Sequence, residues 1–166
     1  MKTKILVSAC LMGHPVRYNA SAKTALGELL HTLHAENRLV THCPELAAGL
    51  PTPRAPAEIF SAQGTQVMSG QARIIENTGA DVTEHYQLAA WLALKAAQTA
   101  GCRAALLTDG SPTCGSTEIY DGSFSGRKIA GSGVAAALLR QHGIVVFSHE
   151  QIPELLTWIA QQEEEE

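Results

Sequence analysis

Short apolar runs that alternate with amphipathic helical segments constrain the fold of this chain more than any other feature. The runs fall at residues 4–8, 38–41, 103–107 and 144–147. Helical patterns fall at residues 23–37, 81–100, 132–142 and 153–161. Each apolar run is short enough to be a strand that is buried on both faces. This alternation of strands and helices favours a parallel sheet with helices packed on both sides.

Signals at the ends of these segments support the same architecture. Asp81 with Glu84 forms a candidate capping box at the start of a helix, and Gly101 is placed to end that helix. Between residues 57 and 76, strand-like pieces around Gly64 predict a small hairpin. We therefore expect an α/β fold: a three-layer, Rossmann-like parallel sheet of about four to five strands, with helices on both faces and a small β-hairpin insertion.

Length and charge limit the classes of function. A chain of 166 residues suits one core, so we expect a single domain over residues 1–162 and an acidic, disordered tail at residues 163–166. Twelve basic residues against sixteen acidic ones argue against a nucleic-acid-binding surface. The apolar run after Lys4 is too short for a signal peptide or a membrane span. We expect a cytoplasmic protein without nucleic-acid or membrane partners; the oligomeric state is not readable.

Three of the four cysteines follow predicted strands. Cys10 and Cys43 come after the first and second strands, and Cys114 lies in the loop after the third. Because the carboxyl ends of parallel strands meet at one edge of a sheet, these three are expected to converge, although 33 and 71 positions separate them. Cys102 precedes its strand, so we expect it at the opposite edge, about 20 Å away.

Spacing alone leaves three interpretations of this cysteine group. Three thiolates can hold a cubane iron–sulfur cluster and leave one iron with an exchangeable position. A zinc site with His42 or His14 as the fourth ligand is a second interpretation, although the chain has no C-x-x-C pair. Small buried cysteines without any metal are the third.

Two polar residues beside the cysteines suggest chemistry. Glu45 lies two positions after Cys43, and a carboxylate beside a metal site can act as a general base toward water. Ser111 lies three positions before Cys114. An exposed or helix-capping role is the alternative for an isolated glutamate.

Three other features allow a functional and a structural interpretation each. Arg54 could steer a substrate or form an ion pair, for example with Glu58. Asp121 is expected to form a turn. The segment at residues 131–133 precedes a helix, where it could bind an anion or simply pack the loop against the helix.

The cysteine motifs resemble those of the small bacterial 2-thiouracil desulfidases. The matching strings include Val7-Ser8-Ala9-Cys10-Leu11-Met12-Gly13, Cys43-Pro44-Glu45 and Ser111-Pro112-Thr113-Cys114-Gly115-Ser116, together with residues 15–18, 49–54, 56–58, 79–83, 119–122 and 124–126. The resemblance covers nearly the whole chain. The sequence departs from the family pattern at Met12, His14 and Thr108, none of which is a proposed ligand, so the departures bear on the substrate more than on the cluster.

The resemblance implies a cofactor and an activity. It implies that Cys10, Cys43 and Cys114 ligate a [4Fe–4S] cluster with one open iron, and that Glu45 and Ser111 serve catalysis. The implied reaction replaces C=S by C=O in a thiolated pyrimidine such as 2-thiouracil and releases sulfide. In it, the substrate sulfur binds the open iron. The alternative is a zinc- or cluster-bearing protein without turnover, either a binding module or a sulfur-transfer partner.

Overall fold

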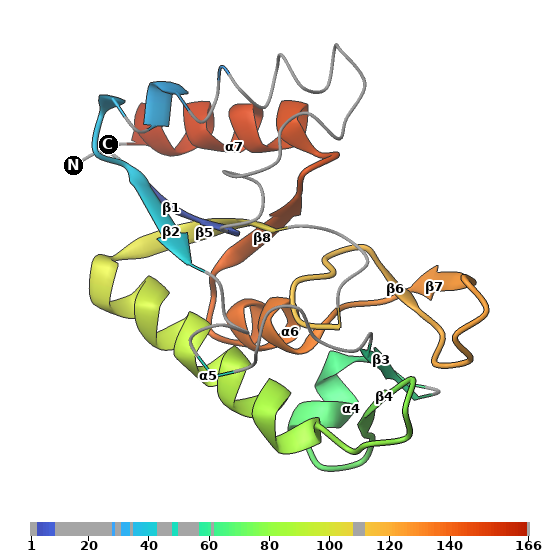
Figure 1. Ribbon diagram of the computed structural model, residues 1–166. Helices are drawn as coiled ribbons and strands as arrows, with labels where there is room; N and C mark the ends of the chain where they lie inside the picture. Colours follow the sequence, from blue (N-terminus) through green and yellow to red (C-terminus); the bar gives the residue numbers. More distant parts are fainter. Residues whose placement is uncertain are drawn as a thin grey trace.

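Four parallel strands form the centre of the protein (Figure 1). The computed structural model describes residues 3–8, 28, 31–33, 35–42, 48–49, 57–60, 62–107 and 112–165. The strands are β1 (Lys4–Ser8), β2 (Leu39–His42), β5 (Cys102–Leu107) and β8 (Val145–Ser148), in the order β2-β1-β5-β8. Each lies within one residue of its predicted position, so the parallel sheet is confirmed.

Helices cover both faces of this sheet (Figure 1). On one face lie α5 (Thr83–Ala100) and α6 (Val134–Gln141), and on the other lies α7 (Ile152–Glu165). Side chains of β1 enter the two cores alternately, because successive residues of a strand point to opposite faces. Leu6 packs in the core under α5 and α6, whereas Ile5 and Val7 pack in the core under α7. The three-layer prediction is confirmed.

The ends of α5 confirm one predicted signal and correct another. The helix ends at Gly101, whose φ of 74° is the left-handed conformation that favours glycine. The predicted capping box is wrong, because the residue that caps α5 is Val82. Asp81 instead accepts hydrogen bonds from the amide and hydroxyl of Thr83, which, together with the Arg73 guanidinium, lower the pKa of the Asp81 carboxyl to about 2.

Two hairpins extend from the same side of the molecule (Figure 1). The predicted one consists of β3 (Ala57–Ile59) and β4 (Ile74–Glu76), paired antiparallel. Its Gly64 begins a helix, α4 (Gly64–Met68), rather than lying in a strand. The second hairpin, β6 (Glu118–Tyr120) with β7 (Lys128–Ala130), was not predicted beyond the turn that follows Tyr120.

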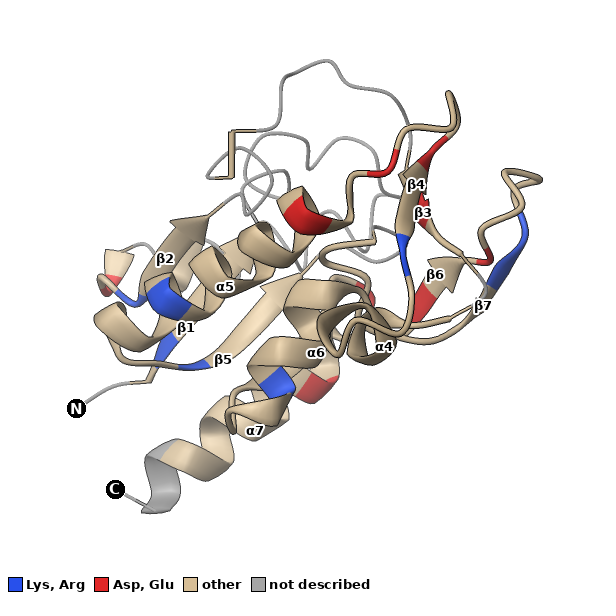
Figure 2. Cartoon of the chain, turned by 90° about the horizontal axis from the view of Figure 1, so that it is seen from below, with Lys and Arg blue, Asp and Glu red and all other residues tan. Residues whose placement is uncertain are grey.

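The last helix is longer than the sequence predicted. It continues beyond the expected end at residue 161 to Glu165, so the backbone of residues 163–165 is helical. The division into a domain over residues 1–162 and a tail over residues 163–166 stays a prediction. Within the described residues, no helix combines the length and apolar character needed to cross a bilayer. In the view of Figure 2, basic and acidic residues are interspersed, and both signs occur on the β6–β7 hairpin.

A buried carboxylate joins the two hairpins. Glu58 in β3 is 9% exposed, and its Oε1 accepts hydrogen bonds from the backbone amides of Gly122 (2.9 Å) and Phe124 (3.2 Å). The turn that it holds contains two residues at positive φ, Gly122 at 97° and Phe124 at 57°. Because phenylalanine rarely adopts this conformation, the turn depends on such an external acceptor.

Glu58→Ala is expected to lower the free energy of unfolding by about 2–3 kcal/mol, because it leaves two backbone amides without their charged acceptor. Glu58→Gln is expected to lower the free energy of unfolding by less than half of that amount, since the amide oxygen of glutamine can still accept hydrogen bonds from both backbone amides. Urea titrations of the two variants and the wild type measure the difference. Equal losses in both variants would contradict the role of Oε1.

Candidate functional site

The candidate site lies at the carboxyl edge of the parallel sheet. The last residues of β1 and β2, Ser8 and His42, are register partners, and Val7 pairs with Leu106 near the end of β5. Three neighbouring strands therefore end at one edge, as the sequence predicted.

Of the predicted site residues, the described part of the chain contains one, Cys114. Cys10, Cys43, Glu45 and Ser111 lie outside the described residues, as does Arg54. In the sequence, Cys43 follows the end of β2 directly, and Cys10 comes two residues after the end of β1.

Cys114 is buried in a tightly packed loop. Its exposed fraction is 7%, that of Thr113 is 0% and that of Ser116 is 3%. The side chain belongs to the core under α5 and α6, and the thiol forms no disulfide. A buried thiol in a packed loop has a well-defined position, which a ligand of a metal or cluster requires.

The N-terminus of α6 holds this loop through its backbone amides. Val134 donates to the carbonyl oxygen of Pro112 (2.8 Å), and Ala135 donates to that of Thr113 (2.9 Å). Gly133 donates to the carbonyl oxygen of Gly115 (2.7 Å). The first amides of a helix have no partner within the helix, and here the loop carbonyls supply one.

Those hydrogen bonds decide between the two interpretations of residues 131–133. The amides of Gly133, Val134 and Ala135 are engaged by the loop, so the segment packs a loop against a helix and does not present an anion site. Gly133 is a residue of the site that was not predicted as one. The pattern that could have indicated it is a glycine directly before the helix that follows the cysteine loop in the sequence.

A histidine lies at the same edge. His42 ends β2, its side chain is half-buried, and burial lowers the pKa of its imidazole below 6.5, so the ring is neutral at pH 7. Within the described part, its Nε2 is buried without a hydrogen-bond partner. A buried polar atom of this kind is satisfied when a polar or metal-containing group occupies the edge. Imidazole nitrogen and thiol sulfur, as in His42 and Cys114, are donor types that bind transition metals.

Two structural interpretations from the sequence concern Asp121, expected to form a turn, and Glu58, considered as the ion-pair partner of Arg54. Asp121 accepts hydrogen bonds from the amide and hydroxyl of Ser123 and lies 4.0 Å from the guanidinium of Arg127, so it shapes a turn, as expected. Glu58, considered as an ion-pair partner of Arg54, binds the turn amides described above.

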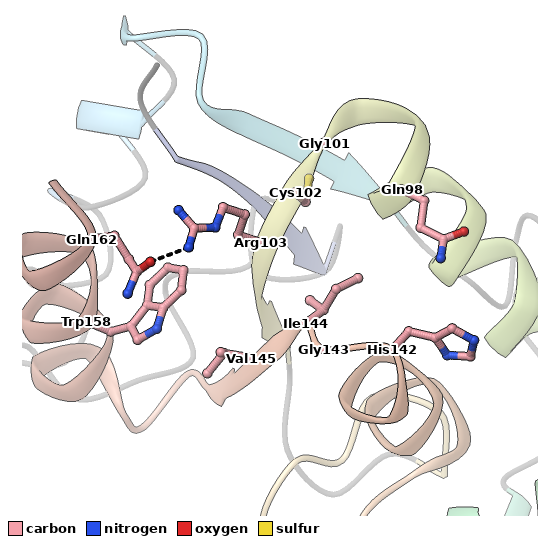
Figure 3. Close-up of a pocket in the computed structure, with 10 residues that line it drawn as sticks. All are labelled: Gln98, Gly101, Cys102, Arg103, His142, Gly143, Ile144, Val145, Trp158 and Gln162. Carbon is pink, nitrogen blue, oxygen red and sulfur yellow. Dashed lines mark hydrogen bonds between the residues drawn. The ribbon is translucent and has the colours of Figure 1, made fainter. Parts of the chain in front are cut away.

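The fourth cysteine lies at the opposite edge. Cys102 is the first residue of β5 and pairs with Lys4 at the start of β1, which confirms that it lies at the amino-terminal edge of the sheet. It lines an open cavity of about 440 Å³ (Figure 3), where Arg103 bonds to Gln162 beside the ring of Trp158. Burial raises the pKa of the Cys102 thiol to about 11, so the sulfur is neutral and a poor metal ligand at pH 7.

Alkylation of Cys102 by iodoacetamide is expected to be very slow at pH 8, where a pKa of about 11 leaves about one thiol in a thousand ionised. Because the pKa is raised, the rate should increase about tenfold per pH unit up to about pH 10. Peptide mass spectrometry across this range measures it. A rate that levels off near pH 9, as for an ordinary thiol, would contradict the assignment.

Comparison with known proteins agrees with the geometry. Residues 5–151 match the family model described as 2-thiouracil desulfurase. The chain is 46% identical to the protein YbbK of Bacillus subtilis (strain 168) over 152 residues, which cover 92% of this chain and 99% of YbbK. It is also similar to a solved [4Fe-4S]-dependent thiouracil desulfidase, TudS, with 43% identity, a TM-score of 0.79, and coverage of 96% of this chain and 99% of TudS. The chain therefore belongs to the 2-thiouracil desulfurase family.

Proposed function

We propose that this protein is a [4Fe–4S]-dependent desulfidase that converts a thiolated pyrimidine, such as 2-thiouracil, into its oxygen analogue and releases sulfide. One observation carries the proposal: sequence and fold are shared, over nearly the whole of both chains, with TudS, described as a [4Fe-4S]-dependent thiouracil desulfidase. The likeness has a TM-score of 0.79 and 43% identity, and it extends over 96% of this chain and 99% of TudS.

The residues of the chain fit such a cluster. Cys10, Cys43 and Cys114 would hold three of its irons, since each follows one of three adjacent parallel strands. The buried thiol of Cys114 is a soft donor, and the Nε2 atom of His42, which has no hydrogen-bond partner among the described residues, is a borderline one. When bound by three cysteines, the cluster supplies one iron with an exchangeable position, a Lewis acid suited to a thiocarbonyl sulfur.

In this proposal, side chains of the protein carry out the remaining steps of the reaction. Glu45 takes a proton from water, and the hydroxide attacks the ring carbon that bears the sulfur. Ser111 donates a hydrogen bond to the ring or relays the proton to the departing sulfur. The carbon–sulfur bond breaks with its electron pair on sulfur, so C=S and water give C=O and hydrogen sulfide. The reaction needs no external oxidant or reductant.

The proposal also implies a cellular compartment for the enzyme. Three reduced thiolates persist in a reducing compartment, so we infer a cytoplasmic enzyme with a small-molecule nucleobase as its substrate. Fractionation of cells followed by detection of the protein tests the location.

Cys114→Ala is expected to remove most of the iron, because it removes one of three cluster ligands. Cys102→Ala is the matched control, since it deletes a buried thiol at the other edge and should leave the iron content unchanged. Iron and acid-labile sulfide are measured after anaerobic reconstitution, with about four of each expected per wild-type chain. A colourless, zinc-loaded wild type, or equal iron loss in both variants, would overturn the cluster assignment.

Glu45→Gln is expected to lower kcat for 2-thiouracil by about 10²- to 10⁴-fold, because the amide cannot accept the proton of water. The visible absorption spectrum should stay as in the wild type. Glu154→Gln, on the exposed surface of α7, is the control. Chromatography of uracil and a sulfide assay follow turnover without any partner protein. Full activity in Glu45→Gln would remove this residue from the mechanism, and a single turnover in the wild type would favour a sulfur-transfer role.

A further inference from the structure

Three backbone segments from distant parts of the sequence are stacked against one another. The first residue of α4, Gly64, donates its amide hydrogen to the carbonyl oxygen of Ser132 at 2.7 Å. The next layer is Gly133, at the start of α6, and the third is the loop of Pro112 and Thr113, which leads to Cys114.

Neither glycine has room for a side chain. A Cβ atom on Gly64 would lie 2.3 Å from the carbonyl oxygen of Gly133. A Cβ atom on Gly133 would lie 2.6 Å from the carbonyl oxygens of both Pro112 and Thr113. Contacts this short are not tolerated, and the obstructing atoms are backbone, so relief requires the chain itself to move.

The movement would reach Cys114. The loop carbonyls of Pro112 and Thr113 accept hydrogen bonds from the amides of Val134 and Ala135, so the loop is bound to the same helix end that the glycines pack against. A methyl group on Gly133 would separate the loop from these amides, because it would contact the same carbonyl oxygens that accept their hydrogen bonds. A methyl group on Gly64 would press on Gly133 and on the amide nitrogen of Val134, which belongs to the same hydrogen bonds. Such a displacement shifts the buried thiol that follows in the chain.

We propose that Gly64 and Gly133 are positioning residues for Cys114. Gly64 packs on Gly133, and Gly133 packs on the loop; this stack sets the position of the Cys114 thiol and links the β3–β4 insertion to it. That the thiol is a cluster ligand rests on the proposed function; the positioning itself does not.

Gly131 provides a matched control in the same segment. A Cβ atom there would meet the side chain of Gln63 at 3.1 Å. The Gln63 side chain can rotate away, whereas the backbone at Gly64 and Gly133 cannot. Gly131→Ala therefore tests whether any added methyl group in this loop has the same effect.

Thiol labelling in the cluster-free, reduced chain measures the position directly. In Gly133→Ala and Gly64→Ala, we expect Cys114 to be alkylated about tenfold faster or more, since a local displacement exposes it. Peptide mass spectrometry reads Cys102 in the same sample, where it reports global unfolding. Labelling of Cys102, and of Cys114 in Gly131→Ala, should change less than about twofold.

Two labelling outcomes overturn the proposal. One is unchanged Cys114 labelling in both glycine variants. The other is a parallel increase at Cys114 and Cys102, which would show a general loss of stability without a local role. After reconstitution, the same variants should release iron to a chelator faster than wild type. A wild-type protein that binds no cluster would refute the proposed function. In that case, thiol labelling of Cys114 would still test whether Gly64 and Gly133 position it.

The wild-type chain offers a test that does not depend on either variant folding. Hydrogen exchange at the amides of Val134 and Ala135 is expected to be as slow as in the interior of α6, because loop carbonyls accept from both. Exchange at the rate of an exposed helix start would show that the loop is not bound to α6, and would overturn the proposal.

Discussion

Parallel pairing of β1 with β2 on one side and β5 on the other is the constraint on which the rest of the molecule depends. Strand β1 is buried on both faces, with Ile5 and Val7 in one core and Leu6 in the other. A shift of one residue would send each side chain into the wrong core. The register that follows from this places the ends of β1 and β2 side by side, from which two of the three candidate ligands continue.

The third candidate ligand depends on a different interaction. The loop of Cys114 is held by amides at the start of α6, which would otherwise be unpaired. Helix starts in sheet-based folds commonly bind phosphate through these groups, but in this protein they bind the backbone of the chain. The helix thereby orders a buried thiol, and the glycines beside it allow the close approach.

The two described cysteines show how position determines the chemistry of one residue type. Cys114 and Cys102 are similarly buried, at 7% and 6% exposure. Cys114 lies in the loop that the start of α6 holds, within the core under α5 and α6. Cys102 lies at the start of β5, where burial raises its pKa to about 11. At the far edge, the nearby Lys4 opposes this rise but does not overcome it.

The sequence by itself determined the four sheet strands, the end of α5 at Gly101 and the place of Cys102 at the start of β5. These features follow from local patterns, namely apolar runs of strand length and a glycine after a helix. The family resemblance likewise rested on contiguous strings around Cys10, Cys43 and Cys114. The roles of the site residues themselves stay predictions.

Only the tertiary structure decided the second hairpin, the start of α4 at Gly64 and the stack of Gly64 on Gly133. Strands of three residues carry too little periodicity to be read, and a lone glycine does not reveal what it packs against. The carboxylate of Glu58 binds amides 64 and 66 positions away. Contacts over such distances leave no pattern in neighbouring residues, since their energy comes from surfaces that meet only when the chain is folded.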